Sequence, residues 1–109
     1  MNKLTMAKAR EIARKVCGSS KVEKADGEYI VTLGEIVVRM RDRCTDFQNR
    51  PLAEVYVGAS AYTTMYLCFW TDTLERCHEA ETMQWRIDTV EQRQDIIQQL
   101  QERGLMKDA

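Results

Sequence analysis

The sequence predicts a single α+β domain that spans residues 1–109. The expected elements are an N-terminal helix, an antiparallel sheet of four to five strands, and a C-terminal helix that is either continuous or interrupted near residues 82–88. The length of 109 residues suits one ordinary domain and is too short for two. Apolar residues recur with a helical period at the two ends of the chain and with a period of two in the middle. Hairpin-like turns without β-α-β alternation favour antiparallel pairing.

The first predicted element is a helix that begins after Thr5 and ends before Gly18. Its apolar face has members spaced three and four residues apart: Leu4, Ala9, Ile12, Ala13, Val16 and Cys17. Thr5 is placed to cap the first turn, and Gly18 is placed to end the helix in the left-handed conformation. We therefore expect this face to pack against the sheet.

The next segments predict a hairpin. Residues 21–24 and 28–33 are extended runs, and Asp26-Gly27 between them is a strong signal for a tight hairpin turn. Gly34 then allows a second tight return into the following strand. These residues therefore form the first half of the sheet.

Two further pairings complete the predicted sheet. In residues 35–41, Ile36, Val38 and Met40 share one face and Val37, Arg39 and Arg41 the other. Residues 42–51, which contain the only proline, form the longest loop. Residues 52–57 and 62–70 are the last two strands, joined through Gly58-Ala59-Ser60. In the last strand, Met65, Leu67 and Phe69 point opposite to Tyr66, Cys68 and Trp70.

The last third of the chain has two interpretations. Residues 72–75, Asp-Thr-Leu-Glu, have the form of a capping box, so a helix is expected to begin near residue 73. A continuous helix from there to Arg103 would be about 46 Å long, which exceeds the width of a small sheet. Alternatively, Met83, Trp85 and Ile87 alternate as in a strand, and residues 88–91 cap a separate helix. We favour a break between residues 81 and 89.

Composition excludes several classes of protein. One Pro and five Gly rule out a collagenous or low-complexity chain. The longest nearly uncharged stretch, residues 55–71, is too polar and too short for a membrane-spanning helix. Residues 1–8 lack the apolar region of a secretory signal. We therefore expect a cytoplasmic protein that does not associate with membranes.

The four cysteines form no C-x-x-C pair. A zinc site made of Cys44, Cys68, Cys77 and His78 is conceivable, but buried free thiols fit the spacing better. We expect Cys17 and Cys68 to be reduced and largely buried, Cys44 in its loop to be the most reactive toward an alkylating agent, and Cys77 to be intermediate in reactivity. No metal or other cofactor is expected.

Two helices cover only one face of such a sheet, so the opposite face needs an explanation. It gathers aromatic and arginine side chains, and the candidate binding residues are Tyr56, Tyr62, Tyr66, Trp70, Arg39 and Arg41. In one interpretation they are cross-strand pairs that each stabilise the sheet by about 0.2–1 kcal/mol. In the other they form an interface, because Tyr, Trp and Arg are enriched at binding hot spots.

The distribution of charge supports a second hypothesis, nucleic-acid binding. Residues 1–50 contain eleven basic and seven acidic side chains, a net of +4, whereas residues 51–109 contain five basic and ten acidic ones, a net of −5. A nucleic-acid site would use Lys8, Arg14, Lys15, Arg39, Arg41 and Arg43. This hypothesis ranks second, because nucleic-acid-binding domains are usually basic overall and Glu54 would interrupt the row of arginines.

The sequence has no recognisable catalytic set. His78 is the only histidine, no G-x-S-x-G motif stands near it, and the glycines are isolated at turns. Cys77 beside His78 would be an activated thiol in an enzyme, although core packing is the simpler role. We therefore predict a non-enzymatic protein-binding module of inhibitor, regulatory or adaptor type. Homodimerisation through the same sheet face is a variant of this prediction.

Overall fold

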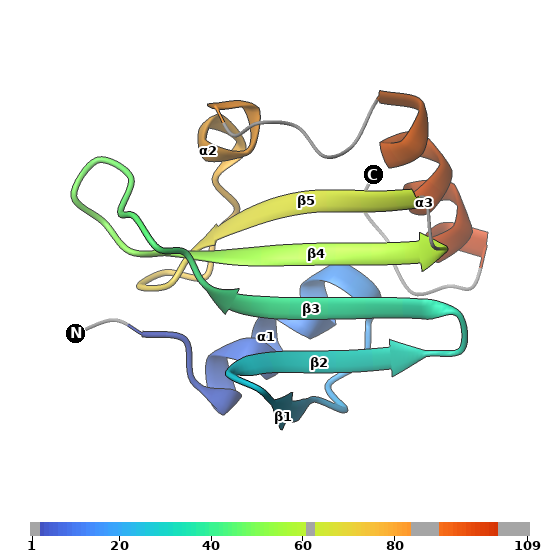
Figure 1. The fold of residues 1–109 in the computed structure, drawn as a ribbon, viewed down its shortest axis with the longest axis horizontal. Coiled ribbons are helices and arrows are strands. Elements are labelled where there is room, and N and C mark those ends of the chain that lie inside the picture. The colour runs from blue at the N-terminus through green and yellow to red at the C-terminus, as the bar shows by residue number, and fades with distance from the viewer. Residues whose placement is uncertain (1–2, 61–62, 84–89, 103–109) are drawn as a thin grey trace.

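The computed structural model describes residues 3–60, 63–83 and 90–102, and Figure 1 shows the arrangement of its elements. In chain order these are α1 (Met6–Cys17), β1 (Glu23–Ala25), β2 (Glu28–Leu33), β3 (Ile36–Asp42), β4 (Leu52–Ser60), β5 (Thr63–Trp70), α2 (His78–Met83) and α3 (Val90–Glu102). Each strand pairs antiparallel with the next, which gives the sheet order β1-β2-β3-β4-β5. The predicted α+β fold with an antiparallel sheet is confirmed.

The turns follow the local sequence. Asp26 and Gly27 have φ angles of 52° and 78°, the pair of positive values that a two-residue type I′ hairpin turn requires. Gly34, with φ of 62°, closes the next hairpin beside the Leu33–Ile36 pair. In the long loop, Phe47 and Arg50 form an isolated bridge. Glycine and short polar residues tolerate these conformations, so the sequence predicted both tight hairpins.

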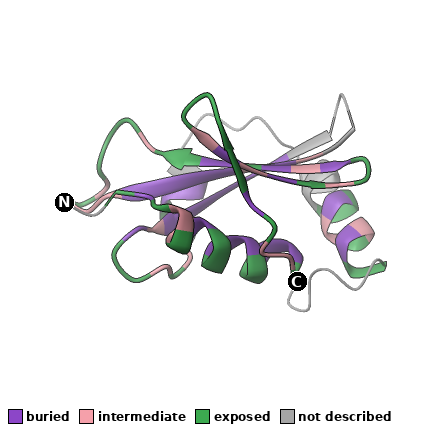
Figure 2. Cartoon of the chain, turned by 90° about the horizontal axis from the view of Figure 1, so that it is seen from below, coloured by how far each residue is buried: buried purple, intermediate pink, exposed green. Residues whose placement is uncertain are grey.

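The first face of the sheet, defined as the one against which α1 and α3 pack, forms the main core. Rows of apolar residues cross the sheet at each level, for example Tyr29, Met40, Val55 and Leu67 in register. Helix α1 covers them with the predicted stripe, and α3 adds Ile96 and Leu100. Figure 2 shows the buried residues gathered between the sheet and the helices, with exposed residues on the outer side.

The predicted caps of α1 are present. The Thr5 side chain accepts a hydrogen bond from the Lys8 backbone N–H, and Gly18 takes the left-handed conformation. Ahead of the helix, the Leu4 backbone N–H donates to the Asp42 carboxylate at 2.9 Å, which ties the start of the chain to the end of β3. These contacts fix the position of α1 against the first face.

The second face, opposite the first, is covered at one end by α2, which departs from the expectation of an uncovered face. Its buried members form a smaller apolar cluster of Leu52, Tyr66, Cys68, Cys77 and Ala80. Cys77 and Ala80 come from α2 and the segment that leads into it. Within the described part of the chain, the short helix α2 therefore divides the second face into a covered half and an open half.

The prediction that a helix begins near residue 73 is wrong, because α2 begins at His78. Leu74 has a positive φ of 63°, and the Thr73 hydroxyl accepts a hydrogen bond from Glu75 in a local turn. Residues 75–77 then pair with the outer edge of β5 through an isolated bridge between Phe69 and Arg76. The segment pairs with the edge of β5 instead of forming the helix that the capping box predicts, because backbone N–H and C=O groups that are buried without a partner cost free energy.

The predicted break in the C-terminal helix falls mostly on residues 84–89, which lie outside the described part of the chain. Helix α2 ends at Met83 and α3 begins at Val90. Met83 is helical, and the other two residues of the alternative strand, Trp85 and Ile87, lie outside the described residues. Within the described ranges, no helix is both long and apolar enough to cross a membrane.

Candidate functional site on the second sheet face

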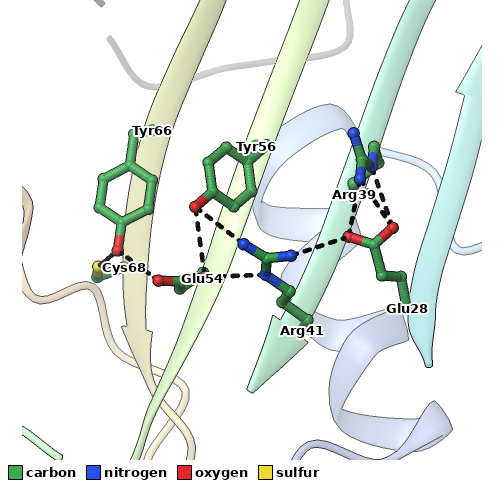
Figure 3. Close-up of polar contacts among 7 residues, drawn as sticks. All are labelled: Glu28, Arg39, Arg41, Glu54, Tyr56, Tyr66 and Cys68. Atoms are coloured by element: carbon green, nitrogen blue, oxygen red, sulfur yellow. Dashed lines mark hydrogen bonds and ion pairs between the residues drawn. The ribbon is translucent and has the colours of Figure 1, made fainter. Parts of the chain in front are cut away.

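The second face is built from strand positions that alternate with the apolar core positions. Two rows cross it in register. One consists of Ile30, Arg39, Tyr56 and Tyr66, and the other of Arg41, Glu54 and Cys68. The period of two along each strand puts these side chains opposite α1, as the close-up in Figure 3 shows.

Glu54 is the centre of a hydrogen-bonded network on this face. Although it is only 6% exposed, its carboxylate accepts bonds from three side chains (Figure 3): Tyr66 at 3.2 Å, Tyr56 at 3.3 Å and Nε of Arg41 at 3.0 Å. Tyr56 and Tyr66 also stack at a tilt, with ring centroids 5.2 Å apart. A buried carboxylate is tolerated when it is paired and hydrogen-bonded, and Glu54 meets both conditions.

Glu28 extends the network toward the edge of the sheet. Its carboxylate accepts hydrogen bonds from Nε and Nη2 of Arg39 at 2.9–3.2 Å, and it lies 3.9 Å from Arg41. Side-chain exposure differs sharply within the pairs, at 15% for Glu28 but 52% for Arg39 and 47% for Arg41. The carboxylates therefore lie against the sheet and the guanidinium groups face outward.

Burial suppresses ionisation at the covered end of the network. It raises the pKa of the Cys68 thiol to about 11 and raises the pKa of Tyr66 well above its ordinary value. The Cys68 thiol donates to the Tyr66 hydroxyl at 3.2 Å, and this hydrogen bond further raises the Tyr66 pKa. The pKa of Arg41 is also raised, chiefly by its hydrogen bond to Glu54. At neutral pH the thiol and the phenol are neutral and Arg41 is charged.

A second buried carboxylate, Glu81 of α2, closes the edge of β5. It accepts the Cys68 backbone N–H at 3.1 Å and pairs with both Nε and Nη2 of Arg76 at 2.8 and 3.0 Å. His78 approaches the same carboxylate at 3.9 Å. The Glu81 carboxylate accepts the backbone hydrogen bond that a neighbouring strand would otherwise accept, so a charge-assisted hydrogen bond holds α2 to the edge of β5.

Trp70 packs against the edge of the apolar cluster that contains Tyr66 and Cys68, at the end of the sheet. The Arg50 guanidinium lies 3.9 Å from the centre of the Trp70 ring, and Phe47 is 6.0 Å from it between centroids. Arg50 also makes a two-pronged ion pair with Asp72, whose hydrogen bonds lower the pKa of that carboxyl. Trp70 is therefore held in an intramolecular cation–π contact.

The structure brings together some of the predicted binding residues and separates others. Arg39, Arg41 and Tyr56 are neighbours in the Glu54 network and reach the open half of the face. Tyr66 belongs to the same network but is only 2% exposed, so it supports the others from below. Tyr62 lies outside the described residues.

The predicted nucleic-acid residues do not form one surface. Lys8, Arg14 and Lys15 are on α1, which packs on the first face. Arg39 and Arg41 lie on the second face in ion pairs with glutamates. Arg43 follows β3, with its Nη1 atom buried and without a hydrogen-bond partner.

Sequence reasoning missed the roles of Glu28, Glu54 and Glu81. For Glu28 and Glu54, the available signal was a glutamate at an alternating strand position, since a carboxylate inside a strand usually needs a partner. Glu81 lies in α2, where a glutamate gives no such signal. The partners of these carboxylates come mainly from other segments, so only the tertiary structure identifies them.

Three of the four cysteines are buried. Cys17 and Cys68 are buried, as expected, Cys44 is exposed in its loop, and Cys77 is buried, which fits the core-packing role. Cys77 is buried because its segment pairs with β5. Among the described residues, no group of three His, Cys, Asp or Glu side chains is arranged to hold a metal ion.

The chain matches no family model, no curated protein and no solved structure.

Proposed function

We propose that the protein is a non-enzymatic binding module whose open half of the second sheet face contacts a protein partner that carries a carboxylate. The observation that carries this proposal is the orientation of the ion pairs. Arg39 and Arg41 are about half exposed, whereas their partners Glu28 and Glu54 lie beneath them. The outer layer of this face is therefore cationic, although each arginine has a glutamate partner.

Arg39 is the best-placed contact for a partner. Its hydrogen bonds to Glu28 use Nε and Nη2, so within the described part of the chain Nη1 has no bond. A guanidinium that is already oriented by one carboxylate loses little side-chain entropy when it binds a second one. Arg39 would therefore form the polar centre of the interface.

Apolar surface surrounds this arginine. Ile30 and Tyr56 flank Arg39 in register, and Val37 and Gly58 form the next row, all four of them half-buried. Tyr56 is additionally packed by Arg41, whose guanidinium lies 5.2 Å from the ring centre. Aromatic and arginine groups on a rigid sheet, with partly exposed apolar neighbours, are typical of binding hot spots.

The chemistry of the buried groups supports a binding role over catalysis. The Cys68 thiol is protonated at neutral pH because burial raises its pKa to about 11, and Tyr66 is neutral for the same reason. A nucleophilic cysteine needs a lowered pKa instead. We place the protein in the cytoplasm as part of this proposal, since four free cysteines suit a reducing compartment.

Partner capture with matched variants tests the proposal. The full chain is immobilised and exposed to a nuclease-treated lysate of the native host, and bound proteins are identified and then purified for titration. Arg39→Ala removes the proposed contact. Arg10→Ala is the matched control, because Arg10 is equally basic and exposed on α1. The partner is expected to bind wild type and Arg10→Ala alike and to bind Arg39→Ala at least about 10-fold more weakly.

Three outcomes would contradict the proposal. Equal weakening by both substitutions would indicate nonspecific charge attraction. Binding that is seen only in a parallel lysate without nuclease treatment, and that falls steeply with salt, would indicate nucleic acid instead, because phosphate contacts release counterions. If the chain binds only itself, and Arg39→Ala abolishes this self-association, then the partner is a second copy of the chain and not a different carboxylate-bearing protein.

A further inference from the structure

Two free cysteines lie opposite each other at the outer edge of the sheet. An isolated antiparallel bridge joins Phe69 and Arg76, and one backbone hydrogen bond lies on each side of it. The Trp70 N–H donates to the Glu75 carbonyl, and the Cys77 N–H donates to the Cys68 carbonyl at 2.8 Å. This single bond places Cys77 beside Cys68, nine positions away in the sequence, while the Cys68 N–H donates to Glu81.

Their side chains share one environment. Both cysteines are free, both are buried, and both belong to the apolar cluster between α2 and the second face. Residues joined by a backbone hydrogen bond across two antiparallel segments have Cα atoms about 5.5 Å apart when they are directly opposed. Disulfides form across Cα separations of about 4.4–6.8 Å, so neighbours of this kind lie within the range of a disulfide.

We infer that Cys68 and Cys77 form an oxidisable dithiol, a modification site at which a peroxide creates a disulfide between β5 and the segment leading into α2. A peroxide is the oxidant of suitable size, because both thiols are nearly inaccessible to larger disulfide-bearing oxidants. The inference is independent of the proposed function, since it concerns the covered half of the face and not Arg39.

The reaction balances in two steps. Hydrogen peroxide oxidises the Cys77 thiol to a sulfenic acid and is reduced to water. Cys68 sulfur then attacks the Cys77 sulfur, the S–O bond breaks, and the hydroxyl leaves with the Cys68 proton as a second water. Cys77 is the site of first attack, because burial holds the pKa of Cys68 at about 11 and keeps its thiolate scarce.

The disulfide would change the Glu54 network. The Cys68 thiol would no longer donate to the Tyr66 hydroxyl, a hydrogen bond of 3.2 Å in the reduced protein. The segment leading into α2 would be covalently tied to β5, where two backbone hydrogen bonds and the Glu81 carboxylate now hold it. Oxidation would therefore make the covered half of the second face more rigid.

Peptide mapping after peroxide treatment tests the inference in the folded chain. Cys44→Ser is used as the background, because Cys44 is exposed and would react first. In this variant, trypsin releases Cys68 in the peptide 44–76 and Cys77 in the peptide 77–86. The expected product under non-reducing conditions is these two peptides joined, lighter by two hydrogen atoms, with the Cys17 peptide unlinked.

Stability provides a second readout. The oxidised protein is expected to melt roughly 5–15 °C above the reduced protein, because the bond constrains the unfolded chain. Cys77→Ser in the same background should show neither the linked peptide nor the shift. Linkage of Cys17 to either residue, sulfinic acid at Cys77 without a linked peptide, or a linked peptide that appears only in denaturant would each overturn the inference.

Discussion

The two faces of the sheet bury different kinds of side chain. The first face packs rows of apolar side chains against α1 and α3. The second face buries the Glu54 carboxylate and is covered at one end by the six-residue helix α2, whose own Glu81 is also buried. Apolar burial supplies most of the stabilising free energy of a small domain, whereas buried ion pairs contribute little net stability. The first face therefore contributes more to stability, and the second face is the one that we propose binds a partner.

The largest expected effect is the loss of a first-face side chain. Leu67 is 1% exposed and lies in the middle of β5 beneath the helices. Leu67→Ala should lower the free energy of unfolding by about 3–4 kcal/mol, through lost burial and the cavity that remains. Urea unfolding at neutral pH measures this loss.

Leu52→Ala is the matched substitution on the second face. Leu52 is equally buried, but its neighbours Phe47 and Trp70 are half-buried and can move into the space. The expected loss is nearer the lower end of the range for such substitutions, about 2 kcal/mol. An equal or larger loss at Leu52 would break the distinction between the faces.

A loss between those of the two leucine variants is expected when the centre of the Glu54 network is removed. Glu54→Ala takes away the acceptor shared by Tyr56, Tyr66 and Arg41, and should cost about 2–3 kcal/mol. Glu54→Gln keeps one acceptor oxygen and should cost about half as much. The two variants are compared by urea unfolding, with Arg10→Ala as an exposed control that is expected to change little. If Glu54→Ala behaves like the exposed control, the network does not stabilise the second face.

The third prediction is a loss of stability in alkali that originates on the second face. Burial raises the pKa of Cys68 from the ordinary 9.0 to about 11 in the folded protein. Below pH 9 the thiol is protonated in both states, so its contribution is fully present. As the pH rises through the folded pKa, the unfolded state has already lost its proton, and the free energy of unfolding falls by on the order of 2 kcal/mol.

Unfolding curves from neutral pH into alkali would measure this loss. Cys68→Ala should flatten the pH dependence, whereas Cys44→Ser, which removes an exposed thiol, should leave it unchanged. Identical pH profiles for wild type and Cys68→Ala would show that the alkaline loss arises elsewhere, for instance at Cys17, whose pKa is also raised by burial.

Much of the fold could be predicted because its signals are local. The spacing of Ile12 and Val16, the Asp26-Gly27 turn and the alternation along β5 each depend on neighbours within a few residues. The same alternation correctly assigned Arg39, Arg41 and Tyr56 to one face. The residues of the candidate site could therefore be predicted in part from the sequence, but the hydrogen bonds between them could not.

By itself, the sequence determined the helix at the start, the hairpins, the order of the strands and which side chains share a face. These features follow from side-chain periodicity and turn conformation, which are set within each segment. Only the tertiary structure decided that α2 begins at His78, that Glu54 is the centre of a network, and that Cys68 faces Cys77. Each of these depends on which distant groups satisfy a buried polar atom or an open strand edge, and that choice is made when the segments pack together.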